Sequence, residues 1–129
     1  MNDNYKHADI TDKIIKAFYK VYNKLGYGFL EKVYERALVI ELSKTDLTVI
    51  SQQMVTVFYG GQEVGYYIAD LIINDKVVVE LKAAECLAEE HEAQLINYLR
   101  ATDIEVGLLL NFGKSPQLKR RVFSNDYKT

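Results

Sequence analysis

The fold is decided by the stretch from residue 69 to residue 82, which reads ADLIINDKVVVELK. Two runs rich in β-branched residues flank Asn74 and Asp75, a pair typical of tight turns, so the stretch predicts a hairpin of two strands, 64–73 and 77–82. The valine run at 77–79 is typical of a strand that is buried on both faces. Residues 48–59 read as a further strand, which ends at the glycine pair 60–61.

Helical periodicity lies on both sides of these strands. Apolar residues recur at three- and four-residue spacing over 10–25 and again over 30–42, which predicts two helices before the strands. The same spacing returns over 85–102, and the apolar run 106–112 predicts a fourth strand. Residues 117–123 could form a short helix or a strand. We therefore expect an α/β fold of order α-α-β-β-β-α-β, with a mixed four-stranded sheet flanked by helices.

Composition limits the class of protein. The chain has 129 residues, 49% of them apolar and 26% charged, which predicts a single globular domain over 1–129. Cys86 is the only cysteine, so an internal disulfide or a multi-cysteine metal site is excluded. A polar start and the lack of a long apolar run predict no signal peptide, no membrane span and a cytoplasmic location. The formal net charge of −2 counts against a tight, non-specific nucleic-acid binder.

The residues that could carry chemistry are Asp70, Glu80 and Lys82. Strand alternation puts Glu80 and Lys82 on one face of the predicted strand 77–82. A two-residue turn would pair residue 70 with residue 79 and leave the two acids on opposite faces. A three-residue connection over 74–76, or a bulge, would place Asp70 opposite Glu80. We predict the second arrangement, because only it brings the carboxylates together.

A pair of adjacent carboxylates can bind a divalent metal ion. Two such groups repel each other unless a cation lies between them, and hard oxygen ligands suit Mg²⁺ or Mn²⁺. The backbone carbonyl of Leu81 would add another oxygen, and Lys82 would assist the attacking water and stabilise charge on a phosphate. The set therefore fits hydrolysis of a phosphodiester. The alternative is a surface cross-strand pair without function, because such short motifs also occur by chance.

Two predicted helices carry further candidates. The 85–102 helix presents one polar stripe, made of His91, Gln94 and Tyr98. For His91 we favour a place at the margin of the core over a ligand role. At the start of the second helix, Glu31 and Tyr34 lie about one turn apart. A glutamate in a first turn is favoured by the helix dipole in any case.

These motifs together resemble the GxxExxY family of the PD-(D/E)XK nuclease superfamily. Its name-giving motif matches Gly28, Glu31 and Tyr34, and the superfamily signature matches Asp70 followed by residues 80–82, with Ala69 in place of proline. Residues 91–99 resemble the helix that supplies a Q-x-x-x-Y motif in exonuclease-like branches. Residues 107–113 resemble the closing strand of the family.

The resemblance implies a PD-(D/E)XK nuclease-like core and a role for each candidate. Asp70 and Glu80 would be metal ligands and Lys82 the catalytic lysine. Glu31 would be an additional acid, bound to the metal directly or through water. Gln94 would position substrate or an outer water, with support from Tyr98.

Two functional hypotheses follow. The first is a Mg-dependent nuclease that acts on nucleic acid, DNA more readily than RNA, and holds the backbone with the basic residues Lys114, Lys119, Arg120 and Arg121. The second is a non-catalytic nucleic-acid- or protein-binding module on the same fold. A homodimer would help so small a protein to hold a duplex.

Overall fold

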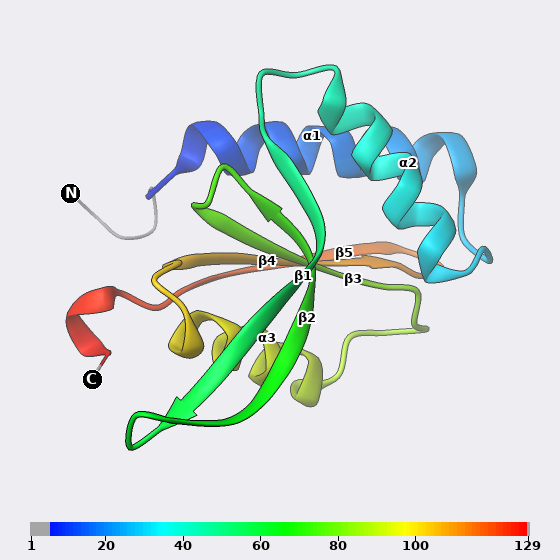
Figure 1. The fold of residues 1–129 in the computed structure, drawn as a ribbon. Helices are drawn as coiled ribbons and strands as arrows, with labels where there is room; N and C mark the ends of the chain where they lie inside the picture. The colour runs from blue at the N-terminus through cyan, green and yellow to red at the C-terminus, as the bar shows by residue number, and fades with distance from the viewer. Residues whose placement is uncertain (1–5, 129) are drawn as a thin grey trace.

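The computed structural model describes residues 6–128, which form one five-stranded sheet between helices (Figure 1). Two helices cover one face of the sheet, and a third helix covers the other face. The elements, in chain order, are α1 (Ala8–Leu25), α2 (Glu31–Ser43), β1 (Val49–Tyr59), β2 (Gln62–Ile73), β3 (Val77–Lys82), α3 (Glu89–Ala101), β4 (Val106–Phe112), β5 (Pro116–Val122) and the short 3-10 helix η2 (Asn125–Tyr127). The predicted α/β architecture is confirmed.

The sheet has one strand more than the four we expected. Its order is β1-β2-β3-β4-β5, with β3 and β4 parallel and every other neighbouring pair antiparallel. The segment 117–123, which we left open between helix and strand, supplies β5. This strand lies at the edge of the sheet and carries three basic residues, so it lacks the apolar run that marks a central strand.

The predicted register between β2 and β3 is confirmed. Leu71 pairs with Val79 and Ile73 pairs with Val77, which leaves three residues, 74–76, in the connection. Asn74 and Asp75 both have positive φ, at 54° and 55°, as expected of asparagine and aspartate in a tight turn. The same register, continued by one residue, places Asp70 opposite Glu80.

Two apolar clusters lie on the two faces of the sheet. The larger joins α1 and α2 to side chains of β2, β3 and β4, among them Leu71 and Val79. The smaller joins α3 to the opposite face, where it includes Ala69 and Ile72. Leu71 and Ala69 are two residues apart yet belong to different clusters, so the side-chain alternation of β2 changes over at Asp70.

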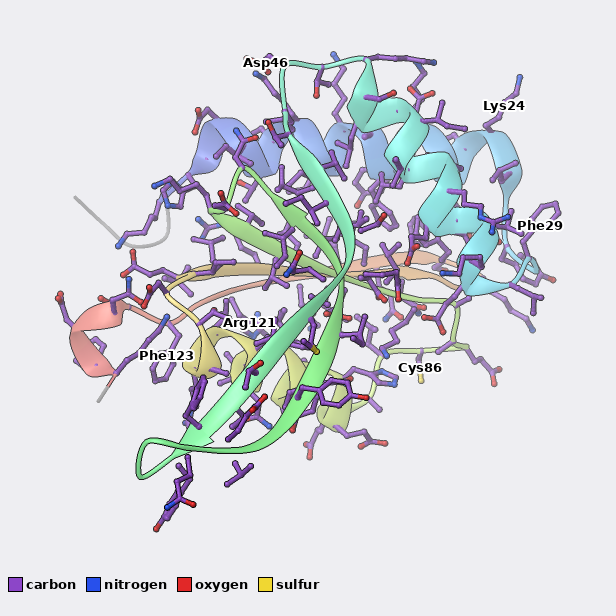
Figure 2. All side chains as sticks on the ribbon, in the orientation of Figure 1. Lys24, Phe29, Asp46, Cys86, Arg121 and Phe123 are labelled. Carbon is purple, nitrogen blue, oxygen red and sulfur yellow. The ribbon has the colours of Figure 1, made fainter. Side chains whose placement is uncertain are left out.

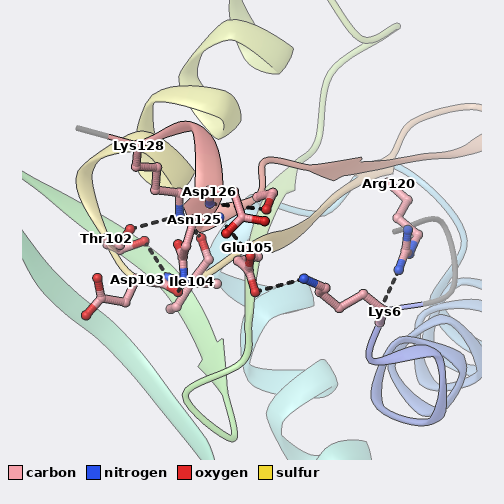
Figure 3. A network of polar contacts seen from close by, with 10 residues as sticks. Lys6, Thr102, Asp103, Ile104, Glu105, Arg120, Asn125, Asp126 and Lys128 are labelled. Carbon is pink, nitrogen blue, oxygen red and sulfur yellow. Dashed lines mark hydrogen bonds and ion pairs between the residues drawn. The ribbon is translucent and has the colours of Figure 1, made fainter. Parts of the chain in front are cut away.

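The end of the described chain is tied to its beginning by a polar network (Figure 3). The Lys6 ammonium donates to Glu105 at 3.1 Å, and the Arg120 guanidinium donates to the Lys6 carbonyl. Lys128 donates to two backbone carbonyls in the loop after α3. Over the same described range, no helix combines the length and the apolar character that crossing a membrane requires.

Candidate active site

The candidate site lies at a fork, where β2 separates from β3. Regular pairing between the two strands ends at Leu71 and Val79. Beyond that point side chains take over: the Leu81 N–H donates to Asp70 Oδ2 at 2.8 Å, and the Asp70 N–H donates to Glu80 Oε1 at 3.4 Å. A continued ladder would have joined Leu81 to the carbonyl of Ala69 instead. The two predicted acids therefore meet at the opening of the fork.

Burial and the neighbouring Asp70 charge act strongly on the Glu80 carboxyl. Glu80 is only 4% exposed, and burial raises its pKa to about 9. The neighbouring Asp70 carboxyl adds to this rise through its charge and through a hydrogen bond, whereas the Lys82 ammonium lowers the pKa of Glu80. At neutral pH the pair therefore holds one proton more than two isolated carboxylates would hold.

Lys82 lies near Glu80 and Glu31, and its ammonium is not paired with another residue in the part of the chain that the structure describes. Its charge acts on the pKa of Glu80 and on that of Glu31. Within residues 6–128, its ammonium makes no hydrogen bond or ion pair. The carbonyl of Leu81 points to the same side as its N–H, toward the fork, because both groups of a strand residue face one neighbour.

Glu31 reaches the site from the first turn of α2. The residue as a whole is exposed, yet partial desolvation of its carboxyl raises its pKa, and the nearby Lys82 charge opposes that rise. The Asp70 charge also raises the pKa of Glu31, which places the two acids in one electrostatic environment.

Tyr34 fixes the loop that leads to Glu31. Its ring is fully buried and stacks on Phe112 at 4.2 Å. Its hydroxyl donates to the Gly26 carbonyl at 2.7 Å and accepts from the Phe29 N–H at 3.1 Å. Gly28, between these contacts, has φ 112°, a conformation that other residues rarely adopt. The spacing of Gly28, Glu31 and Tyr34 is thus explained by the loop.

The polar stripe of α3 divides into different roles. The Tyr98 hydroxyl donates to the Ile68 carbonyl at 2.9 Å, two residues before Asp70, and burial together with the Glu80 and Asp70 charges raises the pKa of Tyr98. His91 Nδ1 accepts from the Ala88 N–H and caps the helix. Gln94 is half-buried, and its side-chain amide makes no hydrogen bond in the described range.

Sequence reasoning missed a hydrogen-bonded pair on the other side of β2, in which the buried Glu35 meets the exposed Gln52. Gln52 would lie opposite Asp70 in the register of β1 and β2, but it has φ 56° and leaves the ladder. Its amide donates to Glu35 Oε1 at 2.7 Å, and Glu35 is 8% exposed. Glu35 stands one turn after Glu31, so it was detectable only as a second acid on the same helix face.

A second missed group holds the loop 83–88, which follows Lys82. Asn111 is fully buried in β4 and makes two hydrogen bonds with the backbone of Ala84, at 2.9 and 3.0 Å. Its amide also donates to Gln117, which accepts from the Leu87 N–H as well. An asparagine inside the run LLLNF was the available signal, because a buried polar side chain needs partners. Figure 2 places this loop, marked by Cys86, at the same end of the molecule as the loop marked by Phe29.

Comparison with known proteins now decides the family. The family model described as "PD-(D/E)XK nuclease superfamily" matches residues 8–122. The chain belongs to the PD-(D/E)XK nuclease superfamily. No curated protein matches it significantly.

A solved structure supports the fold of this superfamily member. The crystal structure of SSO0001 matches with a TM-score of 0.58 at 19% sequence identity, over 94% of this chain. This chain spans 61% of the length of that protein. At this identity the likeness concerns the fold alone.

PD-(D/E)XK nucleases generally use divalent metal ions, and the donors at the fork fit one. Asp70 and Glu80 supply two hard oxygen ligands, and a cation would remove the repulsion that keeps a proton on the pair. Among residues 6–128, no group of three His, Cys, Asp or Glu side chains is close enough to hold a metal ion. The protein donors at the fork are therefore two carboxylates and the Leu81 carbonyl.

Proposed function

We propose that the protein is a metal-dependent nuclease that hydrolyses phosphodiester bonds of nucleic acid. Asp70, Glu80 and the Leu81 carbonyl would hold Mg²⁺ or Mn²⁺. When bound, the ion would supply positive charge against the phosphate oxygens. Lys82 would orient the attacking water and stabilise negative charge that develops on the phosphate.

The observation that carries this proposal is the carboxyl pair at the fork. Burial, together with the Asp70 charge, raises the pKa of Glu80 to about 9, and a carboxyl held in this way is costly to the free protein. This cost supports a binding role over a purely structural one. The unpaired Lys82 ammonium beside them supplies the third part of the superfamily signature.

The remaining candidates would act around this centre. Glu31 would reach the ion through a water molecule, because it does not form a three-acid ligand group with Asp70 and Glu80 in the described range. Gln94, whose amide has no partner in the described range, would position the substrate or that water. Tyr98 would hold β2, and with it Asp70, in place through its bond to Ile68. Membership of the GxxExxY group and a cytoplasmic location belong to the same proposal.

In this proposal the substrate is DNA in preference to RNA. The basic segment 114–121 supports nucleic-acid binding only in part. Arg121 pairs with Glu92, and Arg120 bonds to the backbone of Lys6. Lys114 and Lys119 are the two exposed basic residues of that segment. We therefore assign the contact with the phosphate backbone to these two lysines.

The decisive test is metal-dependent cleavage of plasmid and of single-stranded DNA. We expect Lys82→Ala and Glu80→Gln to lower the cleavage rate by about 10²-fold or more, the size of effect known for transition-state donors. Lys16→Ala is the matched control, because Lys16 is an exposed lysine of α1, on the other side of the sheet from Lys82 and α3. Equal cleavage by Lys82→Ala and the native protein would refute the catalytic assignment.

The second candidate function is a non-catalytic module that binds nucleic acid or a protein on the same fold. The net charge of −2 and the internal pairing of Arg120 and Arg121 favour it, because they limit binding to phosphates. It predicts binding without cleavage at any metal concentration, and equal binding by Lys82→Ala.

A further inference from the structure

The hairpin of β1 and β2 extends beyond the rest of the sheet, and this extension does not take part in the proposed site. Pairing between β1 and β2 continues to Tyr59 and Gln62, long after β3 has ended its contact with β2 at Leu71. Figure 1 shows the ribbon projecting past α3. Its inner face rests on that helix, with Tyr67 against Tyr98 at 5.2 Å. A two-stranded ribbon is marginally stable alone, and this one is supported by α3 on its inner face only.

That other face is apolar and uncovered. By alternation from the cross-strand pairs Met54–Ile68 and Thr56–Tyr66, these residues share one outward face. A bulge between Val57 and Phe58 shifts the register, so that Phe58 pairs with Glu63 and this carboxylate bounds the end of the face. The large side chains of this face are between 40% and 64% exposed: Met54, Phe58, Val64, Tyr66 and Ile68. A contiguous patch of this kind marks an interaction surface.

Charge decides which partners fit this face. The sequence contains no lysine, arginine or histidine from residue 45 to residue 75, and its acids there include Glu63 at the tip of the hairpin. A phosphate backbone or an anionic membrane needs positive charge, so neither fits. An apolar protein surface does.

The two outer strands of the sheet also differ in their content of charged residues. The outer strand β5 carries Pro116, Lys119, Arg120 and Arg121, the residue types that keep an edge from pairing with another chain. The outer strand β1 is longer, with 11 residues, and has neither a charged residue nor a proline. The β1 edge lacks these charged residues, and the apolar face lies beside it.

We propose that this outward face packs against the same face of a second copy of the chain, as a two-fold symmetric dimer. An antiparallel stack of two hairpins puts apolar side chains on apolar side chains and keeps the two Glu63 carboxylates at opposite ends. The five side chains offer roughly 500 Å² per copy, hence roughly 1,000 Å² in total, at the lower limit of specific interfaces. Interfaces at this limit are typical of weak association, so the dimer is sought at micromolar concentrations. It does not depend on the proposed nuclease activity.

The test is sedimentation velocity of the full chain across the micromolar range. The wild type should change from monomer to dimer as concentration rises, and Phe58→Glu with Tyr66→Glu should remain a monomer. Phe58→Ser with Tyr66→Ser repeats the test without added charge. Tyr59→Glu is the matched control: Tyr59 lies in the same hairpin and is 80% exposed, but alternation turns it to the other face. It should dimerise like the wild type.

Three results would overturn the dimer. They are a wild type that stays monomeric throughout, a dimer that survives both double variants, and a dimer that high salt dissociates, since an apolar contact is not weakened by screening. Thermal unfolding of each variant confirms that it is folded. If the wild type is monomeric and the double variants lose its binding to single-stranded DNA, the face is assigned to nucleic acid instead.

Discussion

Replacing Glu80 by glutamine should remove a large part of the pH dependence of stability in the metal-free protein. Glutamine has nearly the same shape but no charge to bury. The pKa of Glu80 rises from 4.5 to about 9 on folding, because the carboxyl is buried beside Asp70. The folded state therefore binds its proton more tightly than the unfolded state does. Stability from this group is fully present below pH 4.5 and is lost as pH rises toward 9.

The magnitude follows from the width of that window. Each pH unit inside it removes about 1.4 kcal/mol, so the wild type should lose about 2 to 3 kcal/mol between pH 5 and pH 7. For a chain of 129 residues, 1 kcal/mol corresponds to about 4 °C in Tm, which gives a fall of about 10 °C. Glu80→Gln should show none of this fall in Tm. Subtracting the Tm of one protein from that of the other at each pH removes the contribution of the other titrating groups.

The assay is thermal unfolding from pH 5 to pH 9 with a chelator present, followed by the same series with Mg²⁺. The control is Glu63→Gln, an exposed acid at the tip of the hairpin, which should follow the wild type. With Mg²⁺ at ten times its Kd, the wild type should gain about 1.4 kcal/mol at pH 7 and Glu80→Gln much less. Parallel curves for wild type and Glu80→Gln would refute the argument from burial, and a missing Mg²⁺ effect would refute the metal site.

Three further substitutions test the residues that hold the site. Tyr34→Phe leaves two backbone groups of the loop before α2 without their partner, and should cost about 1–3 kcal/mol in urea unfolding. Gly113→Ala would bring a Cβ to 2.5 Å from the Ala84 carbonyl oxygen, and should cost about 1–3 kcal/mol in the same measurement while Gly65→Ala, at an open position, costs less. Tyr98→Phe removes the bond to the Ile68 carbonyl and should weaken Mg²⁺ binding, measured by calorimetry, with little change in secondary structure by circular dichroism.

The central features of the fold were predictable because local and long-range signals agree there. The strand bounds 77–82 and 106–112 were predicted as the structure has them, since buried strands are continuous apolar runs. The opposition of Asp70 and Glu80 followed from the length of one connection. The fifth strand was not predicted, because an edge strand with three consecutive basic residues has the composition of a loop.

What escaped prediction depends on tertiary contacts between distant segments. Gln52 adopts a left-handed conformation in mid-strand, and its partner Glu35 lies 17 positions earlier. Asn111 is bonded to the backbone of Ala84, 27 positions away. Tyr34 matched a motif whose spacing gave a role to Glu31, but only the coordinates show that the tyrosine holds the loop. Residue spacing predicts which side chains share one helix face or one hairpin. The contacts above join two separate elements, so spacing alone does not predict them.

The fork at Asp70 links the candidate site to the projecting hairpin. If β2 continued beside β3, backbone groups would saturate each other and Asp70 would not take the Leu81 N–H. Because β2 turns away at this residue, its carboxylate meets Glu80 where the two strands separate, and beyond this point β2 pairs with β1 alone. The hairpin beyond Asp70 is therefore a two-stranded ribbon whose inner face rests on α3. The same separation of β2 from β3 brings the two acids together and lets the hairpin that carries the proposed dimer face project from the sheet.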